Sequence, residues 1–146
     1  MKSLLATSQD PTLALMRLFL AIIFFAHGSQ KALGWFHGYG FQGTMHFFTA
    51  MLHIPPFFAV LAILAEFAGS ILLFFGLFAR IAALGILVNM FVAIFKVHLP
   101  HGFFMNWSGA QTGEGYEFHL LAIALAFLIL IKGAGGFSID GAISKS

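Results

Sequence analysis

The sequence contains no cysteine and very little charge. Of its 146 residues, 8% are Asp, Glu, Lys or Arg. The absence of thiols excludes disulfide bonds, thiolate catalysis and thiolate metal sites. The seven Lys and Arg exceed the five Asp and Glu by only two, and so small an excess of positive charge does not indicate a nucleic-acid-binding protein. We therefore expect no nucleic-acid partner.

Apolar residues dominate what is present. They make up 60% of the chain, and twenty of them are Phe, whereas soluble domains are about half apolar and a quarter charged. A soluble globule of this size would leave many rings exposed to water. A bilayer-spanning helix needs about 20 apolar residues, so four spans and their connections would occupy the whole chain. We predict a single all-α membrane domain, residues 1–146, built as an antiparallel bundle of four transmembrane helices in contact with lipid.

The four apolar stretches can be placed along the chain. The predicted spans are residues 13–33, 56–78, 81–97 and 117–131. Asp10 and Pro11 suit the cap and first turn of the first helix. Arg17 interrupts the apolar run that a cleaved signal peptide would need, so we expect this helix to be retained.

The connection between the first two spans has apolar residues at helical spacing. They recur at positions 41, 45, 48 and 52, a pattern typical of a helix with one apolar face. Trp35 and Tyr39 suit the level of the lipid headgroups. The connection is therefore predicted to form a short helix in the membrane interface, which Pro55 and Pro56 would end.

The positions of Lys and Arg predict the orientation of the chain, because cytoplasmic loops are enriched in these residues. With both termini in the cytoplasm, that side holds five of them: Lys2, Arg17, Arg80, Lys132 and Lys145. The opposite side holds Lys31 and Lys96. The distribution favours cytoplasmic termini, with both long, His-rich connections facing outward, and it is sufficient to explain Arg80 in its short turn.

Glu66 is an ionisable residue in the middle of an apolar helix. At 1.5 Å per residue it lies about 15 Å from the start of that helix, close to the middle of a bilayer. A charge at this depth costs at least about 2.5–3.5 kcal/mol, so the carboxyl group should face the bundle and be paired or protonated. Glu66 is our best candidate for a catalytic residue, as a proton relay or an acceptor for a quinol. The alternative is a structural link between helices.

Other polar residues are expected to gather in the outer half of the bundle, because successive helices are antiparallel. The predicted substrate-binding residues are His27, Lys31, Glu66, Asn89, His98, Glu117 and His119. Glu66 and Asn89 would form the floor of an outward-facing polar pocket. Each residue also has a simpler interpretation. Lysines such as Lys31 and Lys96 can extend to the membrane surface, an Asn can link helices, and the histidines can be packing residues.

Seven histidines raise the question of a metal site. His46 and His53 are seven residues apart in the predicted interfacial helix, and His98 and His101 are three apart after the third span. No carboxylate or thiolate set completes either pair into a metal site. We therefore expect solvated interfacial histidines and no bound metal.

Several stretches of the chain resemble the DoxX family. The most specific is EFAGSILLFFGLFARIAA at residues 66–83, and RLFLAIIFFAHGSQKALG at residues 17–34 is similar to the first helix of that family. Shorter matches are Lys96-Val-His98, Gly115-Tyr116-Glu117 and Gly135-Gly136-Phe-Ser-Ile-Asp140. The resemblance extends over about residues 13–140. The matching motif positions are His27, Lys31, Glu66, Arg80, His98 and Glu117.

The resemblance implies a small four-helix protein of the bacterial inner membrane. The founding relatives belong to thiosulfate:quinone oxidoreductase, and others are described as membrane partners of redox or sulfur-handling enzymes. The family supplies no proven catalytic role for the motif positions. Because this chain has no Cys, any redox role must use a quinone or the cofactor of a partner enzyme.

Two functional hypotheses from different classes follow. In the first, the chain is the membrane subunit of an oxidoreductase system, with Glu66 handling a proton and with His27 and Lys31 fixing an anionic or carbonyl group of a quinone or small substrate. In the second, it is a non-enzymatic small-solute carrier or an assembly factor. The sequence leaves open whether the chain is itself an enzyme and whether it forms a homo-oligomer.

The predicted orientation can be tested with reporter fusions. Green fluorescent protein fused after Ser146 is expected to fluoresce, and alkaline phosphatase at the same position is expected to be inactive, because both termini are predicted to be cytoplasmic. Fusions within residues 102–116 should behave in the opposite way. Phosphatase activity from the fusion after Ser146 would contradict the orientation.

Overall fold

A computed structural model describes the backbone of residues 2–145 and the side chains of residues 4–144. Within residues 2–145 every regular element is helical and no strand occurs. The elements are α1 (Lys2–Leu5), α2 (Pro11–Leu33), α3 (Gly40–His46), the π-helix η1 (Phe47–Met51), α4 (Pro56–Phe75), α5 (Ala79–Ala93), the π-helix η2 (Ile94–His98), the 3-10 helix η3 (Leu99–His101), α6 (Glu117–Lys132) and α7 (Ile139–Lys145). The side chains of Lys2 and Lys145, which entered the predicted charge distribution, lie outside the described residues.

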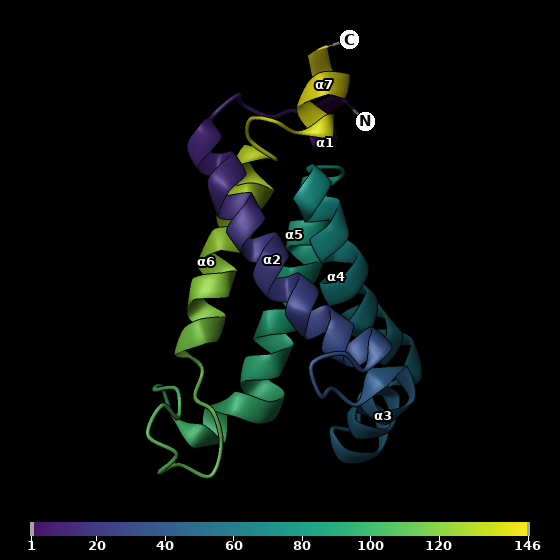
Figure 1. Ribbon diagram of the computed structural model, residues 1–146, viewed down its shortest axis with the longest axis vertical. Helices are drawn as coiled ribbons and strands as arrows, with labels where there is room; N and C mark the ends of the chain where they lie inside the picture. Colours follow the sequence, from purple (N-terminus) through teal and green to yellow (C-terminus); the bar gives the residue numbers. More distant parts are fainter. Residues whose placement is uncertain (1, 146) are drawn as a thin grey trace.

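The four longest helices of the described chain pack in succession. α2 contacts α4, α4 contacts α5, α5 contacts α6, and α6 contacts α2. The two ends of the chain lie together beside α1 and α7, while the long connections lie at the opposite end of the molecule (Figure 1). The all-α class predicted from the sequence is confirmed for the described residues.

Three helical stretches are long and apolar enough to cross a membrane. They are Pro11–Leu33, Pro56–Phe75 and Ala79–His101, the last of which runs from α5 through η3. α6 coincides with the fourth predicted span, but its 16 residues extend for only about 24 Å at 1.5 Å per residue.

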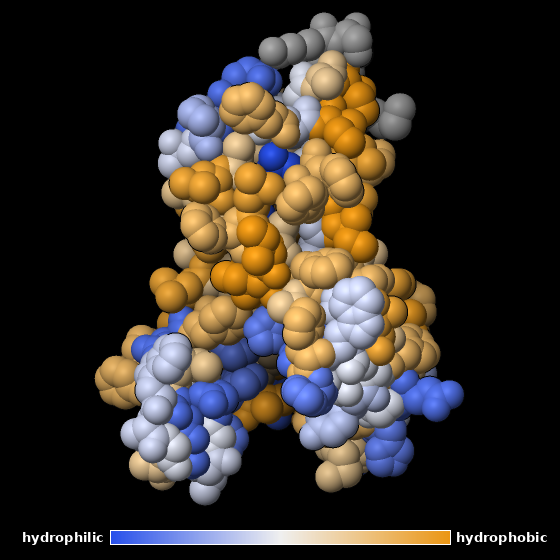
Figure 2. Space-filling view, in the orientation of Figure 1, coloured by the Kyte–Doolittle hydropathy of each residue, from blue (hydrophilic) through white to orange (hydrophobic). Residues whose placement is uncertain are grey.

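Large apolar side chains cover the outside of the helices. On α2, Leu15, Phe19 and Ile22 are each more than half exposed, and their spacing places them along one helical face. Figure 2 shows hydrophobic surface around the middle of the molecule, with hydrophilic surface toward its two ends. A soluble protein does not expose so large an apolar surface. The chain is therefore a membrane protein whose helices contact lipid.

Glycines in the left-handed conformation set the ends of two helices. Gly34 (φ 75°) ends α2 where the sequence predicted, and Asp10 begins it by accepting a hydrogen bond from the Thr12 N–H at 2.8 Å. Gly76 has a φ of 62°, so α4 ends at Phe75 rather than at the predicted residue 78. The tight turn before α5 is therefore residues 76–78.

The predicted interfacial helix is present but differs in form. It begins at Gly40 as α3 and continues as the wider π-helix η1 up to Met51. The chain then turns at His53, which has a φ of 54°, before Pro55 and α4. Tyr39, at the start of α3, is 84% exposed, which suits an aromatic residue at the membrane surface.

Arg17 has a structural role that the sequence did not reveal. The sequence predicts a positive charge on the cytoplasmic side at this position, yet the Arg17 side chain is 1% exposed. Its Nη1 donates to the carbonyl oxygens of Leu73 at 2.7 Å and Phe74 at 3.0 Å, and its Nη2 donates to that of Phe137 at 3.2 Å. The last carbonyls of a helix lack partners within it and carry partial negative charge. A buried guanidinium is therefore stabilised where α4 ends.

Asp140 closes the same end of the bundle. Its carboxylate is 1% exposed and accepts hydrogen bonds from the backbone N–H groups of Phe78 at 2.8 Å and Ala79 at 2.9 Å. A Cβ on Gly76 would lie 2.4 Å from Arg17 Nη1, so glycine is required there. The segment after α6 folds as α7 and is attached across the α4–α5 turn.

The cap at α5 yields a stability prediction. Asp140→Ala removes two charge-assisted hydrogen bonds to buried N–H groups and is expected to lower the free energy of unfolding by about 3 kcal/mol. Asp10→Ala, the matched control, removes one exposed cap bond and is expected to cost about 1 kcal/mol. Thermal unfolding in detergent, followed by circular dichroism, measures both. Equal losses for the two variants would contradict the proposed importance of Asp140.

Candidate functional site

Glu66 lies near the middle of α4 and has a partner on each carboxylate oxygen. The residue is 3% exposed. Oε2 accepts a hydrogen bond from Lys31 Nζ of α2 at 2.5 Å, and Oε1 accepts one from Asn89 Nδ2 of α5 at 2.7 Å. Both contacts suit the carboxylate form. One side chain thus joins three helices.

Lys31 supplies the positive charge that a carboxylate at this depth needs. Its side chain is 26% exposed, against 4% for that of Glu66. Removing two ions from water costs several kcal/mol for each unless they pair closely and form further hydrogen bonds. The bond from Asn89 provides one of these. The structure thus pairs Lys31 within the bundle instead of extending it to the membrane surface.

Glycines allow both partner helices to approach α4. A Cβ on Gly28, one turn before Lys31, would lie 2.6 Å from the backbone of Phe67, so α2 touches α4 at this point. Gly85, one turn before Asn89, faces Ala65, and a Cβ there would lie 3.2 Å from the Ala65 Cβ. Small residues permit such close helix contacts in membranes, and here they bring the polar side chains of the following turn within reach of Glu66.

The three histidines predicted to bind substrate lie toward the end of the bundle away from the chain termini. The rings of His98 and His119 are 4.0 Å apart between centroids. His98 Nδ1 lies 2.8 Å from the carbonyl oxygen of Glu114; a carbonyl only accepts, so this nitrogen carries the proton. His119 is 6% exposed, and its Nδ1 has no hydrogen-bond partner within the described chain. His27 packs against Phe118, with ring centroids 5.8 Å apart.

The polar residues form one group. The rings of His98 and His119 lie side by side, Lys31 and Asn89 both bond Glu66, and His27 lies one turn before Lys31 on α2. We call His27, Lys31, Glu66, Asn89, His98 and His119 the outer cluster. In Figure 2 the surface is hollowed at the end away from the termini, between the lobe of the 102–116 connection and that of α3, and hydrophilic side chains line this hollow.

The sequence model of the family DoxX matches residues 12–99, more than half of the chain. The chain belongs to the DoxX family. The match includes α2, α4 and α5. It therefore includes Glu66 and the two residues that bond it, Lys31 and Asn89. It ends before α6, and therefore before Glu117 and His119.

Two DoxX-type relatives are similar over nearly the whole chain. The protein named "Putative oxidoreductase CatD" of Bacillus subtilis (strain 168) is 29% identical over 131 residues, which cover 90% of this chain and 86% of CatD. The "Inner membrane protein YqjF" of Escherichia coli (strain K12) is 28% identical over 137 residues, 94% of this chain and 95% of YqjF. No solved structure matches the chain. An alignment of 94% of the chain necessarily includes α6.

Glu117 and Lys96 bond to the outer connections of this DoxX protein. Glu117 Oε1 accepts hydrogen bonds from the Met105 N–H at 2.9 Å and from Trp107 Nε1 at 3.3 Å. Lys96 Nζ donates to the carbonyl oxygen of Leu52 at 3.2 Å. These contacts attach both residues to the two long connections of the chain. Substrate binding by Glu117 stays a prediction.

The histidines considered as metal ligands do not form a larger set. Among the described residues, no group of three or more His, Asp or Glu side chains is arranged to hold a metal ion. His101 Nδ1 lies 3.4 Å from the hydroxyl of Thr112 in the outer connection.

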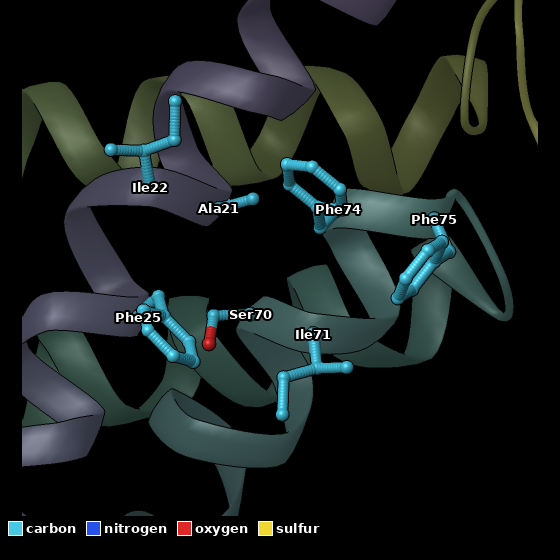
Figure 3. A pocket seen from close by; sticks show the side chains of 7 residues that line it. All are labelled: Ala21, Ile22, Phe25, Ser70, Ile71, Phe74 and Phe75. Atoms are coloured by element: carbon cyan, nitrogen blue, oxygen red, sulfur yellow. The ribbon is translucent and has the colours of Figure 1, made fainter.

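An apolar groove lies between α2 and α4, on the side of the molecule shown in Figure 3. It has a volume of about 320 Å³ and is lined by Ala21, Ile22, Phe25, Ser70, Ile71, Phe74 and Phe75. The one hydroxyl in it, that of Ser70, donates to the carbonyl oxygen of Phe67 at 2.7 Å. The close contact of α2 with α4 at Gly28 separates this groove from Lys31. The groove therefore offers a ligand no free polar side chain.

A double-mutant cycle tests the pairing around Glu66. Lys31→Met leaves a buried carboxylate without its counter-charge and is expected to lower the free energy of unfolding by about 3 kcal/mol. Adding Glu66→Gln removes the unpaired charge, so the double variant should recover most of that loss. Thermal unfolding in detergent measures both.

The control for this cycle is Lys96→Met. It removes the same charge from an exposed side chain that bonds one carbonyl, and it should change stability by less than about 1 kcal/mol. A double variant no more stable than Lys31→Met alone would show that the pair is not the reason for the loss.

Proposed function

We propose that this DoxX protein is a multi-pass protein of the bacterial inner membrane, with four spanning helices and both termini in the cytoplasm. The proposal is supported by three helices of spanning length, by the shared position of the termini (Figure 1), and by the name of its relative YqjF. Residues 118–131 of α6 contain no Asp, Glu, Lys or Arg. A short apolar helix can span a bilayer that thins locally, which suits α6 as the fourth span.

Within that membrane, the outer cluster is proposed to bind a quinone or a similarly small carbonyl ligand for an oxidoreductase system. The observation that carries this proposal is the Glu66–Lys31 pair, in which Glu66 is buried near the middle of α4 and Lys31 reaches it from the last turn of α2. Ionisable residues inside a membrane are costly and are usually kept for function. The name of the relative CatD points to the same class of chemistry.

The residues of the outer cluster fit the groups that a quinone presents. Carbonyl oxygens accept hydrogen bonds, and Lys31 has three N–H donors, of which one is used by Glu66. His119 Nδ1 is a second available polar atom. The partly buried ring of Phe118, whose centroid is 5.8 Å from that of His27, provides an apolar face beside this histidine. A bound quinone would supply two-electron, two-proton redox chemistry.

Each residue of the cluster then has a definite task. Lys31 would orient a carbonyl oxygen of the ligand by donating a hydrogen bond to it. Glu66 would hold or release a proton at Oε2 as Lys31 turns toward the ligand, while Asn89 keeps its bond to Oε1 and fixes the carboxylate. Because the chain has no Cys, electrons would come from the cofactor of a partner enzyme.

The second function considered for this chain is a small-solute carrier or an assembly factor. A carrier needs access to its site from both sides of the membrane. At the cytoplasmic end, however, Arg17 and Asp140 are buried and bonded to the ends of α4 and α5. The closed inner end favours a site that exchanges ligand and protons with the outer side alone.

Ligand binding provides the test of the proposed function. Glu66→Gln is expected to fold and insert but to bind a short-chain ubiquinone analogue at least about tenfold more weakly, which corresponds to roughly 1.4 kcal/mol. The rise in unfolding temperature with added analogue measures the affinity. Glu114→Gln removes the same charge from the exposed connection and should bind like the wild type.

Two results would contradict the proposal. One is wild-type protein that shows no ligand-dependent stabilisation. The other is a Glu66→Gln variant that is unstable but responds to the analogue as the wild type does, because Glu66 would then be a structural link between helices.

A further inference from the structure

Arg80 lies in a second groove, at the end of the molecule where the chain termini lie. The groove has a volume of about 320 Å³ and is lined by residues of α1, α5 and α6: Leu4, Arg80, Ile81, Leu84 and Leu130. This volume is at the lower end of the range of about 300–1,000 Å³ for small-molecule sites. Four of the five lining residues are apolar, so the groove combines one positive charge with a hydrophobic wall.

The charge of Arg80 has no acidic partner in the described chain. Nη1 donates to the carbonyl oxygen of Leu130 at 2.5 Å, and Nη2 donates to that of Ala6 at 3.0 Å. Nε is buried without a hydrogen-bond partner among the described residues. Within residues 4–144 the structure contains the ion pair of Lys31 with Glu66 and no other. Nη1 and Nη2 each carry two N–H groups, and each uses one of them in these bonds, so Arg80 has donors left for an anion.

The hydrophobic wall continues from Arg80 along α5. Ile81 and Leu84 are 50% and 46% exposed, and Leu84 lies one helical turn from Arg80, toward the middle of the bilayer. Leu130 of α6 forms the opposite wall. Such a groove matches an amphiphile that has its negative charge at the membrane surface and its apolar chain directed inward.

We propose that this groove binds an anionic phospholipid, with its phosphate on the Arg80 guanidinium and one acyl chain against Ile81, Leu84 and Leu130. Basic pockets between helices at the cytoplasmic surface of membranes bind anionic headgroups in this way, and a guanidinium matches the geometry of phosphate oxygens. Arg17 cannot take this role because it is 1% exposed. The proposal does not depend on the function of the outer cluster.

Native mass spectrometry of the purified protein with an equal mixture of phosphatidylglycerol and phosphatidylcholine tests the lipid site. One basic residue near a membrane surface is expected to give a preference of about fivefold for the anionic lipid. Arg80→Gln should lose this preference. Lys132→Gln, which removes an exposed charge at the same end of the molecule but outside the groove, should retain it.

A second variant separates lipid binding from the structural bonds of Arg80. Leu84→Trp leaves the guanidinium in place but fills the apolar wall, and it should also lose the preference for phosphatidylglycerol. Inorganic phosphate, added at the same concentration, should not raise the unfolding temperature, whereas phosphatidylglycerol should.

Three results would overturn the proposal. A wild type without preference would mean that no such site exists. An equal loss in Lys132→Gln would indicate diffuse attraction to negative lipids, and an equal stabilisation by inorganic phosphate would indicate an anion site without a lipid chain.

Discussion

The bond between Lys31 and Glu66 is the interaction on which the rest of the bundle depends. A carboxylate in the middle of an apolar helix is tolerated only where an opposite charge reaches it, and Lys31 does so at 2.5 Å. This requires α2 to touch α4, which Gly28 permits. It also favours close packing of α5 against α4, so that Asn89 can donate a hydrogen bond to the second carboxylate oxygen of Glu66. The packing of three helices thus follows from the need to neutralise one charge.

The two ends of the molecule solve the problem of unpaired polar groups differently. Where the termini meet, Arg17 covers free carbonyls of α4 and Asp140 covers free N–H groups of α5, so the helix ends are satisfied by the chain itself. At the other end, His119 keeps a buried nitrogen without a partner among the described residues, and the connections stand apart around a hollow. The closed end stabilises the bundle, and the open end is where we propose that a ligand binds.

Much of this arrangement could be predicted from the sequence. The apolar runs placed the helices, and depth along α4 identified Glu66 as a residue that must face the bundle. Antiparallel order also brought Lys31 and Asn89 to the right depth. Their direct contacts with Glu66 could not be predicted, because they depend on helix rotation and on backbone approach at Gly28 and Gly85. The burial of Arg17 was missed because its partners are carbonyls more than fifty residues away, which no local pattern reveals.

The sequence by itself determined that this chain is an all-helical membrane protein with charged residues in its apolar helices, because composition and periodicity depend only on local order. It also carried the motifs of the DoxX family. Tertiary structure alone decided which charges are paired and which are not. Lys31 is paired with Glu66 of another helix, Arg17 is buried against the last carbonyls of α4, and Arg80 borders a groove with no acidic partner in the described chain. Pairing depends on distances across helices, and only the packed bundle sets them.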